Sequence, residues 1–137
     1  MSFLAGLRLP VFAAPMFLVS GPELVIAAAR AGIIGAFPNN NVRTSEDYGD
    51  WLRRISDALG SHGTSGALPW AANLITHSTN TRLPGDLEQV RRFRPPIVIT
   101  SLGSPRPVME TVHGYGGLVF ADVIDLRLAR KAAEAGV

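Results

Sequence analysis

The chain has 137 residues, 47% of them hydrophobic and 18% charged, which is the composition of an ordinary globular protein of single-domain size. Its net charge is +2 and its only basic cluster lies at 91–94, where a solvated helix face explains it, so we expect no nucleic-acid partner. The absence of cysteine excludes disulfides, thiolate catalysis and cysteine-ligated metals. Because no apolar run approaches about 18 residues and the N-terminus lacks a secretory signal, we expect no membrane contact and a cytoplasmic protein.

The first apolar run, residues 11–16, predicts a buried strand that ends in Ala14-Pro15-Met16. A helix should follow, because Ser20 and Glu23 have the spacing of a capping box and Pro22 suits a first helical turn. Its inward face should comprise the residues that recur at the helical period, and Gly32 should end it. These inward residues are Leu24, Ala27, Ala28 and Ala31.

The same plan of strand, loop and helix recurs along the rest of the chain. Further strands are expected at 33–37, 70–75, 97–101 and 118–123. A helix is expected after each of these strands. The first of them should be capped by Thr44 or Ser45, the next should begin near Gly85, and the last two should be capped by Ser104 and Asp125. The second helix should bury Tyr48, Trp51, Leu52, Ile55 and Leu59, and the last should bury Leu128, Ala129, Ala132 and Ala135.

Uninterrupted apolar strands indicate a parallel sheet that is buried on both faces. A doubly wound open sheet and a (β/α)₈ TIM barrel both meet this condition. Each strand is apolar at its start and polar where it ends, as at Asn39–Asn41, Asn73, Ser101 and Asp122, and a barrel uses all of its strand ends for ligands. No Gly-x-Gly-x-x-Gly follows the first strand, so the barrel is favoured.

A complete barrel of this type takes roughly 250 residues. Residues 1–137 supply about the first four and a half βα units. We therefore expect an incomplete polypeptide that represents the N-terminal half of a TIM barrel, with open strand edges.

Three ordered segments carry a resemblance to a known family. They are Ala14-Pro15-Met16 with Ser20-Gly21-Pro22-Glu23-Leu24, the helix end and strand from Ala31 to Phe37, and Ala72-Asn73-Leu74. In this order they resemble the N-terminal half of the nitronate monooxygenase family, formerly called 2-nitropropane dioxygenase.

The resemblance implies a TIM barrel that holds FMN over the C-terminal strand ends and oxidises alkyl nitronates, with dioxygen as the final acceptor. It implies that Ala14, Pro15 and Met16 lie beside the flavin ring and that Asn73 hydrogen-bonds it. A flavin also needs an apolar floor with a few placed amides, which these residues offer.

The resemblance also implies that the family's histidine, which follows strand six, and its phosphate-binding loops lie beyond Val137, so no catalytic residue is assigned and the fragment alone should be inactive. Some members carry lysine at the end of strand five, where this chain has Asp122. Asp122 could contact the cofactor, the substrate mouth or the start of the final helix.

Other residues are assigned to the site from their position in the chain alone. His77 follows the third strand and Ser101 ends the fourth, so both are weak candidates for substrate contact, whereas His62 and His113 should be structural or exposed. Asn73 could instead bond a neighbouring backbone, and Asn39–Asn41 should form a turn. No histidine has a metal-ligand spacing, so no metal is expected.

Two alternatives to a nitronate monooxygenase stay open. One is a related FMN barrel, such as an NAD(P)H-dependent enoyl-thioester reductase. The other is a non-catalytic half-barrel whose open strand edges would favour association into a homo-oligomer.

Overall fold

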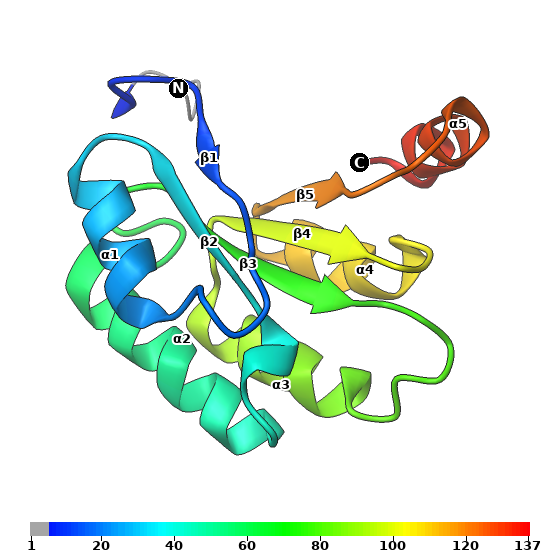
Figure 1. Cartoon of the computed structure of the whole chain (residues 1–137), viewed down its shortest axis with the longest axis horizontal. Helices are drawn as coiled ribbons and strands as arrows, with labels where there is room; N and C mark the ends of the chain where they lie inside the picture. The colour runs from blue at the N-terminus through cyan, green and yellow to red at the C-terminus, as the bar shows by residue number, and fades with distance from the viewer. Residues whose placement is uncertain (1–5) are drawn as a thin grey trace.

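The computed structural model describes residues 6–137, which form one parallel sheet whose strands alternate with helices (Figure 1). The strands are β1 (Phe12–Ala13), β2 (Ile34–Pro38), β3 (Trp70–Ile75), β4 (Ile97–Ser101) and β5 (Leu118–Ala121). The helices are α1 (Pro22–Arg30), the short 3₁₀ helix η2 (Asn39–Asn41), α2 (Ser45–Leu59), α3 (Leu83–Phe93), α4 (Arg106–Gly114) and α5 (Leu126–Ala135). The α/β repeat expected from the sequence is confirmed.

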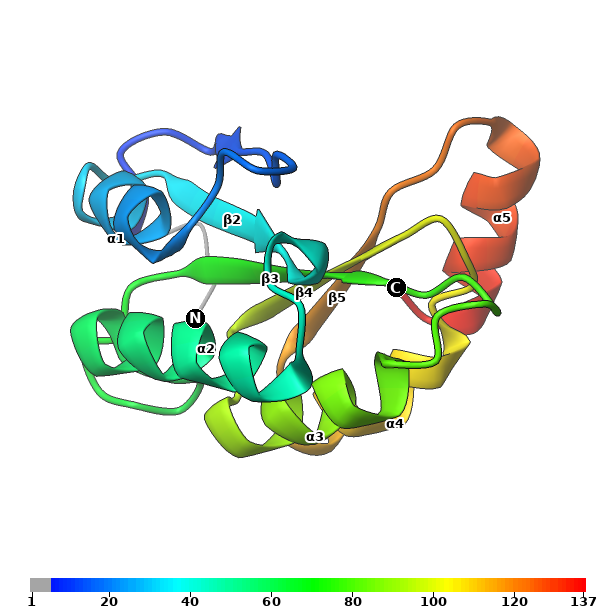
Figure 2. The same ribbon diagram turned by 60° about the horizontal axis from the view of Figure 1, so that its bottom comes forward.

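The strands lie side by side in sequence order, and each neighbouring pair is parallel. In Figure 2, α2, α3 and α4 run along one side of the sheet, while α1 and α5 lie at its two ends. The main core lies between the sheet and these helices, where Phe37, Trp70 and Leu74 pack with the buried face of α2. That face includes Tyr48, Leu52, Ile55 and Leu59, as predicted.

A second, smaller core occupies the opposite, concave face of the sheet. Its buried members are Ile34, Ala36, Ala71 and Ile97, with Phe12 and Phe120 packed against them. The rings of Phe12 and Phe120 meet edge to face with centroids 5.6 Å apart, although β1 and β5 are the two outermost strands. The sheet is therefore curved so strongly that its edges approach each other across the concave face.

The register shows that this curvature is that of an eight-stranded barrel. One hydrogen-bonded row runs through Ala36, Ala71, Ile97 and Leu118, and Ala14 joins it one residue past the Ala13–Gly35 pair. Phe12 lies two residues before this row and Phe120 two residues after it, so the two rings are offset by four residues over four strand steps. A shear of eight over eight strands has the same offset, about one residue per strand. The chain thus has the fold of the first five βα units of a (β/α)₈ barrel.

The start of α1 differs from the prediction. Gly21 is the N-cap residue, and no side chain caps the first turn of α1 by a hydrogen bond, so the prediction of a capping box at Ser20 and Glu23 is wrong. The helix buries Val25, Ala28 and Ala29, whereas Ala27 and Ala31 are exposed. The cause is the close approach of α1 to β2, since a Cβ at Gly35 would lie 2.6 Å from the Cα of Val25. This contact turns the face around Val25 toward the sheet.

Two strands are shorter than predicted. Residues 14–16 leave β1 because the Met16 carbonyl accepts turn hydrogen bonds from Val19 and Ser20. β5 ends at Ala121, and Val123 beyond it is exposed. The other element boundaries lie within two residues of the expectation, and Thr44 and Asp125 cap α2 and α5 as predicted. No helix among residues 6–137 has the length and apolarity that a membrane crossing requires.

Candidate functional site

The C-terminal ends of the strands bring three of the predicted site residues to one level of the barrel interior. Applying the one-residue offset per strand places Ala14, Asn73 and Asp122 in a single layer, contributed by β1, β3 and β5. This layer lies directly above the layer of Phe12, Ala71 and Phe120. Ala14 and Asp122, which are 108 positions apart in the sequence, thus share one layer at the open end of the barrel, where ligands of this fold bind.

Asn73 is 3% exposed, and its amide group is fixed by the neighbouring strand. Its Nδ2 donates to the Ile99 carbonyl at 3.0 Å and to the Ser101 hydroxyl at 2.8 Å. Because a carbonyl can only accept, these two bonds also fix which amide atom is nitrogen. The backbone partner considered from the sequence is therefore present, and the atom that Asn73 has left for a ligand is Oδ1, an acceptor.

Ser101 lies beside Asn73 at the end of β4 and is 7% exposed. Its Oγ accepts the hydrogen bond from Asn73, which leaves its own O–H able to donate. The backbone around it is also held, since the Ser101 carbonyl accepts from the Thr76 N–H at 3.0 Å. Asn73 and Ser101 together offer one acceptor and one donor from rigid strand ends.

Pro15 and Met16 lie in the loop that follows β1, and this loop is held by two side chains. The Ser20 hydroxyl accepts from the Met16 N–H at 3.0 Å and donates to the Ala14 carbonyl at 3.4 Å. Asn41 accepts from the Leu18 N–H at 2.8 Å and donates to the Met16 and Ser20 carbonyls at 3.1 and 2.7 Å. The structure therefore gives Ser20 and Asn41 roles that the sequence pattern did not predict.

The held loop displays apolar side chains to solvent. Met16, Phe17, Leu18 and Val19 are 41–77% exposed, and Leu18 has the left-handed φ of 61°. Leu102, in the loop after β4, shares this φ and is 70% exposed. A left-handed backbone costs a leucine about 1–2 kcal/mol, so tertiary contacts must maintain both conformations.

A buried polar network supports the same end of the barrel from the helix side. Asp86 is fully buried and accepts hydrogen bonds from Asn39 Nδ2, Ser45 Oγ and Arg82 Nε at 2.6, 2.8 and 3.0 Å. Asn39 Oδ1 in turn accepts from the Ile75 N–H at 3.3 Å. The expected turn at Asn39–Asn41 is the 3₁₀ helix η2: its Asn39 side chain ties the β3 end to α3, and its Asn41 side chain holds the loop after β1. Single polar residues at a turn carry no sequence signal for such long-range partners.

His77 and Asp122 are the two other residues considered near the strand ends. His77 is exposed, and its Nδ1 lies 2.8 Å from the Thr79 hydroxyl within the same loop. Asp122 does not cap the final helix, because Asp125 Oδ1 accepts from the Leu128 N–H. That reading of Asp122 is therefore wrong, and its place in the upper layer remains. Among the described residues 6–137, no cluster of three His, Asp or Glu side chains could hold a metal ion.

Comparisons with known proteins bear on the fold. No model of a protein family matches the chain, and no curated protein is similar to it in sequence. Among solved structures it is similar to FabK from Thermotoga maritima, with a TM-score of 0.81 and 19% identity over 98% of this chain and 40% of that chain. A point mutant of the same FabK gives the same TM-score and identity, with 42% of that chain covered. The chain thus spans about two fifths of the length of these structures, and its fold matches that part of them.

Proposed function

We propose that this chain forms the flavin-facing N-terminal part of an FMN-dependent oxidoreductase, whose substrate is an alkyl nitronate and whose final acceptor is dioxygen. The observation that carries the proposal is the layer formed by Ala14, Asn73 and Asp122 at the open end of the barrel. The likeness to FabK supports it at the level of the fold.

The polar groups at the ends of β3 and β4 suit the edge of a flavin ring. That edge presents an imide N–H between two carbonyls, so it needs an acceptor and a donor side by side. Asn73 Oδ1 and the Ser101 O–H supply this pair, and both side chains are nine-tenths buried or more. Such placed polar groups on an otherwise apolar floor are typical of cofactor sites.

The residues that follow β1 suit the face of the ring. Ala14 has a small side chain, so a planar group can approach the backbone there. Met16 is 41% exposed on a loop that Ser20 and Asn41 hold in place, which provides a fixed apolar wall. The flavin, when bound, would supply the electron acceptor that none of these side chains can provide.

A second candidate is an NAD(P)H-dependent reductase of enoyl thioesters on the same barrel. The likeness to FabK supports the two candidates equally, because both use one fold and one position for the flavin. A non-catalytic half-barrel that associates with another copy is the third possibility, since β1 and β5 each have one neighbour in the described sheet.

Addition of FMN to the purified chain tests the proposal. We expect a shifted and structured visible flavin band and a raised Tm, because a ligand that binds only the folded state stabilises it. Unchanged spectra and an unchanged Tm at millimolar FMN would contradict flavin binding by this chain. With flavin bound and oxygen excluded, a change of the flavin spectrum caused by an alkyl nitronate but not by NAD(P)H favours the first candidate, and the reverse favours the second.

A further inference from the structure

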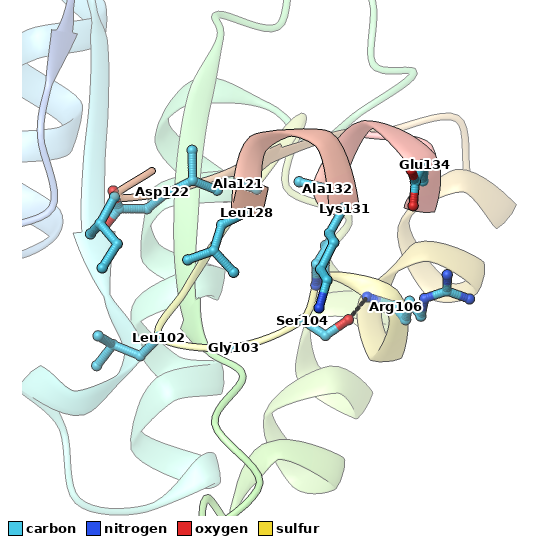
Figure 3. Close-up of a pocket in the computed structure, with 13 residues that line it drawn as sticks. Leu102, Gly103, Ser104, Arg106, Ala121, Asp122, Leu128, Lys131, Ala132 and Glu134 are labelled. Carbon is cyan, nitrogen blue, oxygen red and sulfur yellow. Dashed lines mark hydrogen bonds between the residues drawn. The ribbon is translucent and has the colours of Figure 1, made fainter. Parts of the chain in front are cut away.

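A cavity of about 710 Å³ lies outside the concave face, between α5 and the loops that follow β4 and β5. Its size falls in the range of small-molecule sites. Its walls come from the β4–α4 loop, the end of β5 and one side of α5 (Figure 3). Of the residues proposed to hold the flavin, only Asp122 borders it, so the cavity is a separate space.

The apolar wall of the cavity contains Leu102, Ile124 and Leu128. Leu102 and Ile124 are 70% and 91% exposed, so they contribute little to the core. Leu102 is nevertheless held in the left-handed conformation, with φ 61°. Its neighbour Gly103 packs so tightly that a Cβ there would lie 2.3 Å from the Thr76 carbonyl oxygen. The loop is thus fixed in a strained form that turns an apolar side chain toward the cavity.

The polar wall contains Lys131, which is the only lysine of the chain. Figure 3 shows its side chain extending from α5 toward the β4–α4 loop, where Ser104 lies. The Ser104 hydroxyl accepts from the Arg106 N–H at 3.3 Å and keeps its own proton for donation. Within residues 6–137, Lys131 has no ion-pair partner, unlike Arg53, Arg54, Arg82, Arg91 and Arg127.

Three other charged residues border the cavity, and none of them lies beside Lys131. In Figure 3 the Arg106 guanidinium points away from the space, Glu134 lies one turn further along α5, and Asp122 lies on the opposite side. The charge at the centre of the polar wall is therefore the Lys131 ammonium, which faces apolar side chains across the cavity.

We propose that this cavity binds a small amphipathic carboxylate, with its anionic end on Lys131 and Ser104 and its apolar end on Leu102, Ile124 and Leu128. A cation opposite an apolar wall fits this ligand class, because neither a neutral hydrocarbon nor a compact polar anion would use both walls. The proposal stands apart from the flavin site and does not depend on it.

Calorimetric titration of the intact chain with octanoate tests the proposal. We expect octanoate to bind saturably in a one-to-one complex and octanol to bind much more weakly. The Lys131→Gln variant should bind octanoate with an affinity reduced by about 10-fold or more, the order expected for a lost charge-assisted hydrogen bond. Arg130→Gln is the matched control, because Arg130 is exposed on the same helix and does not line the cavity, and it should bind as the parent does. Leu102→Asn should also weaken binding, since asparagine tolerates the left-handed backbone and removes only the apolar contact.

Chemical labelling gives a second readout that does not depend on activity. Octanoate should protect the Lys131 amine from acetylation, followed by mass spectrometry, while the α-amino group at the N-terminus serves as the internal reference. Equal binding of octanol and octanoate, unchanged affinity in Lys131→Gln, or no binding of octanoate by the parent chain would each overturn the proposal.

Discussion

The Asp86 carboxylate accepts a hydrogen bond from the Asn39 side chain at 2.6 Å, in a site where Asp86 has no exposed surface. The two residues are 47 positions apart in the sequence, and Arg82, the N-cap residue of α3, joins the pair. Buried charges persist only when they are paired and hydrogen-bonded. This contact therefore fixes how the β2 end meets the start of α3, next to the strand ends of the candidate site.

Replacing Asp86 with asparagine should destabilise the fold by about 3–5 kcal/mol, because the Arg82 charge loses its partner and two amide groups face each other. Asp50→Asn is the matched control, since Asp50 forms an exposed i,i+3 pair with Arg53, and it should cost under about 1 kcal/mol. Urea denaturation measures the free energy of unfolding of both variants, which can be compared when their m-values are unchanged. Similar losses in the two variants would show that the buried network contributes no more than a surface pair.

Both tyrosines of the chain should make its stability fall at alkaline pH. Burial raises the pKa of Tyr48 well above its ordinary value, and burial also raises the pKa of Tyr115, whose hydroxyl donates to the Pro95 carbonyl. Below pH 10 the phenols are neutral in the folded and unfolded states alike. Above about pH 10 only the unfolded state ionises, so each tyrosine should lower the free energy of unfolding by about 1.4 kcal/mol per pH unit.

Absorbance at the tyrosinate band during a pH titration checks this prediction, because it should appear only together with unfolding. Tyr48→Phe should remove part of the slope. At neutral pH it should cost little or even stabilise, since the Tyr48 hydroxyl has no hydrogen-bond partner among the described residues. Tyrosinate formation in the native state near pH 10 would contradict the burial of both rings.

Asn41 should matter for the loop after β1 far more than its neighbour does. Asn41→Ala removes three hydrogen bonds to that loop and should cost about 1–3 kcal/mol. Asn40→Ala is the control, because Asn40 is exposed, and its effect should stay within about 0.5 kcal/mol. Hydrogen exchange at the Leu18 amide gives a local readout, and its protection should be lost in Asn41→Ala alone.

The curvature of the sheet predicts an energetic coupling between Phe12 and Phe120. A double-mutant cycle with leucine at both positions should give a coupling of about 0.5–1.5 kcal/mol, as for other edge-to-face aromatic pairs. Phe12 and Phe93 belong to different cores, so the stability losses caused by their substitution should add within about 0.5 kcal/mol. Additivity of Phe12 and Phe120 would mean that the sheet is flatter than an eight-stranded barrel requires.

Local signals in the sequence predicted the elements that local chemistry controls. Thr44 caps α2, Gly60 ends it and Asp125 caps α5, because each acts on residues within one helical turn. Asn73 at a strand end was also identifiable, since a polar residue in an apolar strand needs a partner.

Features that depend on the tertiary register were not predictable in this way. Ser20 matched a capping box, yet its hydroxyl forms hydrogen bonds with the backbone of Ala14 and Met16. The N-cap of α1 is Gly21, one residue later than expected, because α1 packs closely against Gly35. The partners of Asn39, Asn41 and Asp86 are set by strand order and helix packing. The common layer of Ala14, Asn73 and Asp122 follows only once the register between all five strands is known.

The most direct test of flavin binding by these strand ends compares FMN with riboflavin, by quenching of flavin fluorescence on titration with the chain and with an Asn73→Leu variant. The proposed contacts, made by Ala14, Met16, Asn73 and Ser101, involve the ring and not the phosphate, so FMN and riboflavin should bind the parent chain with similar Kd. Asn73→Leu should weaken both about 5- to 50-fold, the order expected for one lost hydrogen bond and an unpaired partner. No quenching by the parent chain, or equal affinity in Asn73→Leu, would contradict the assignment of the strand ends to the flavin.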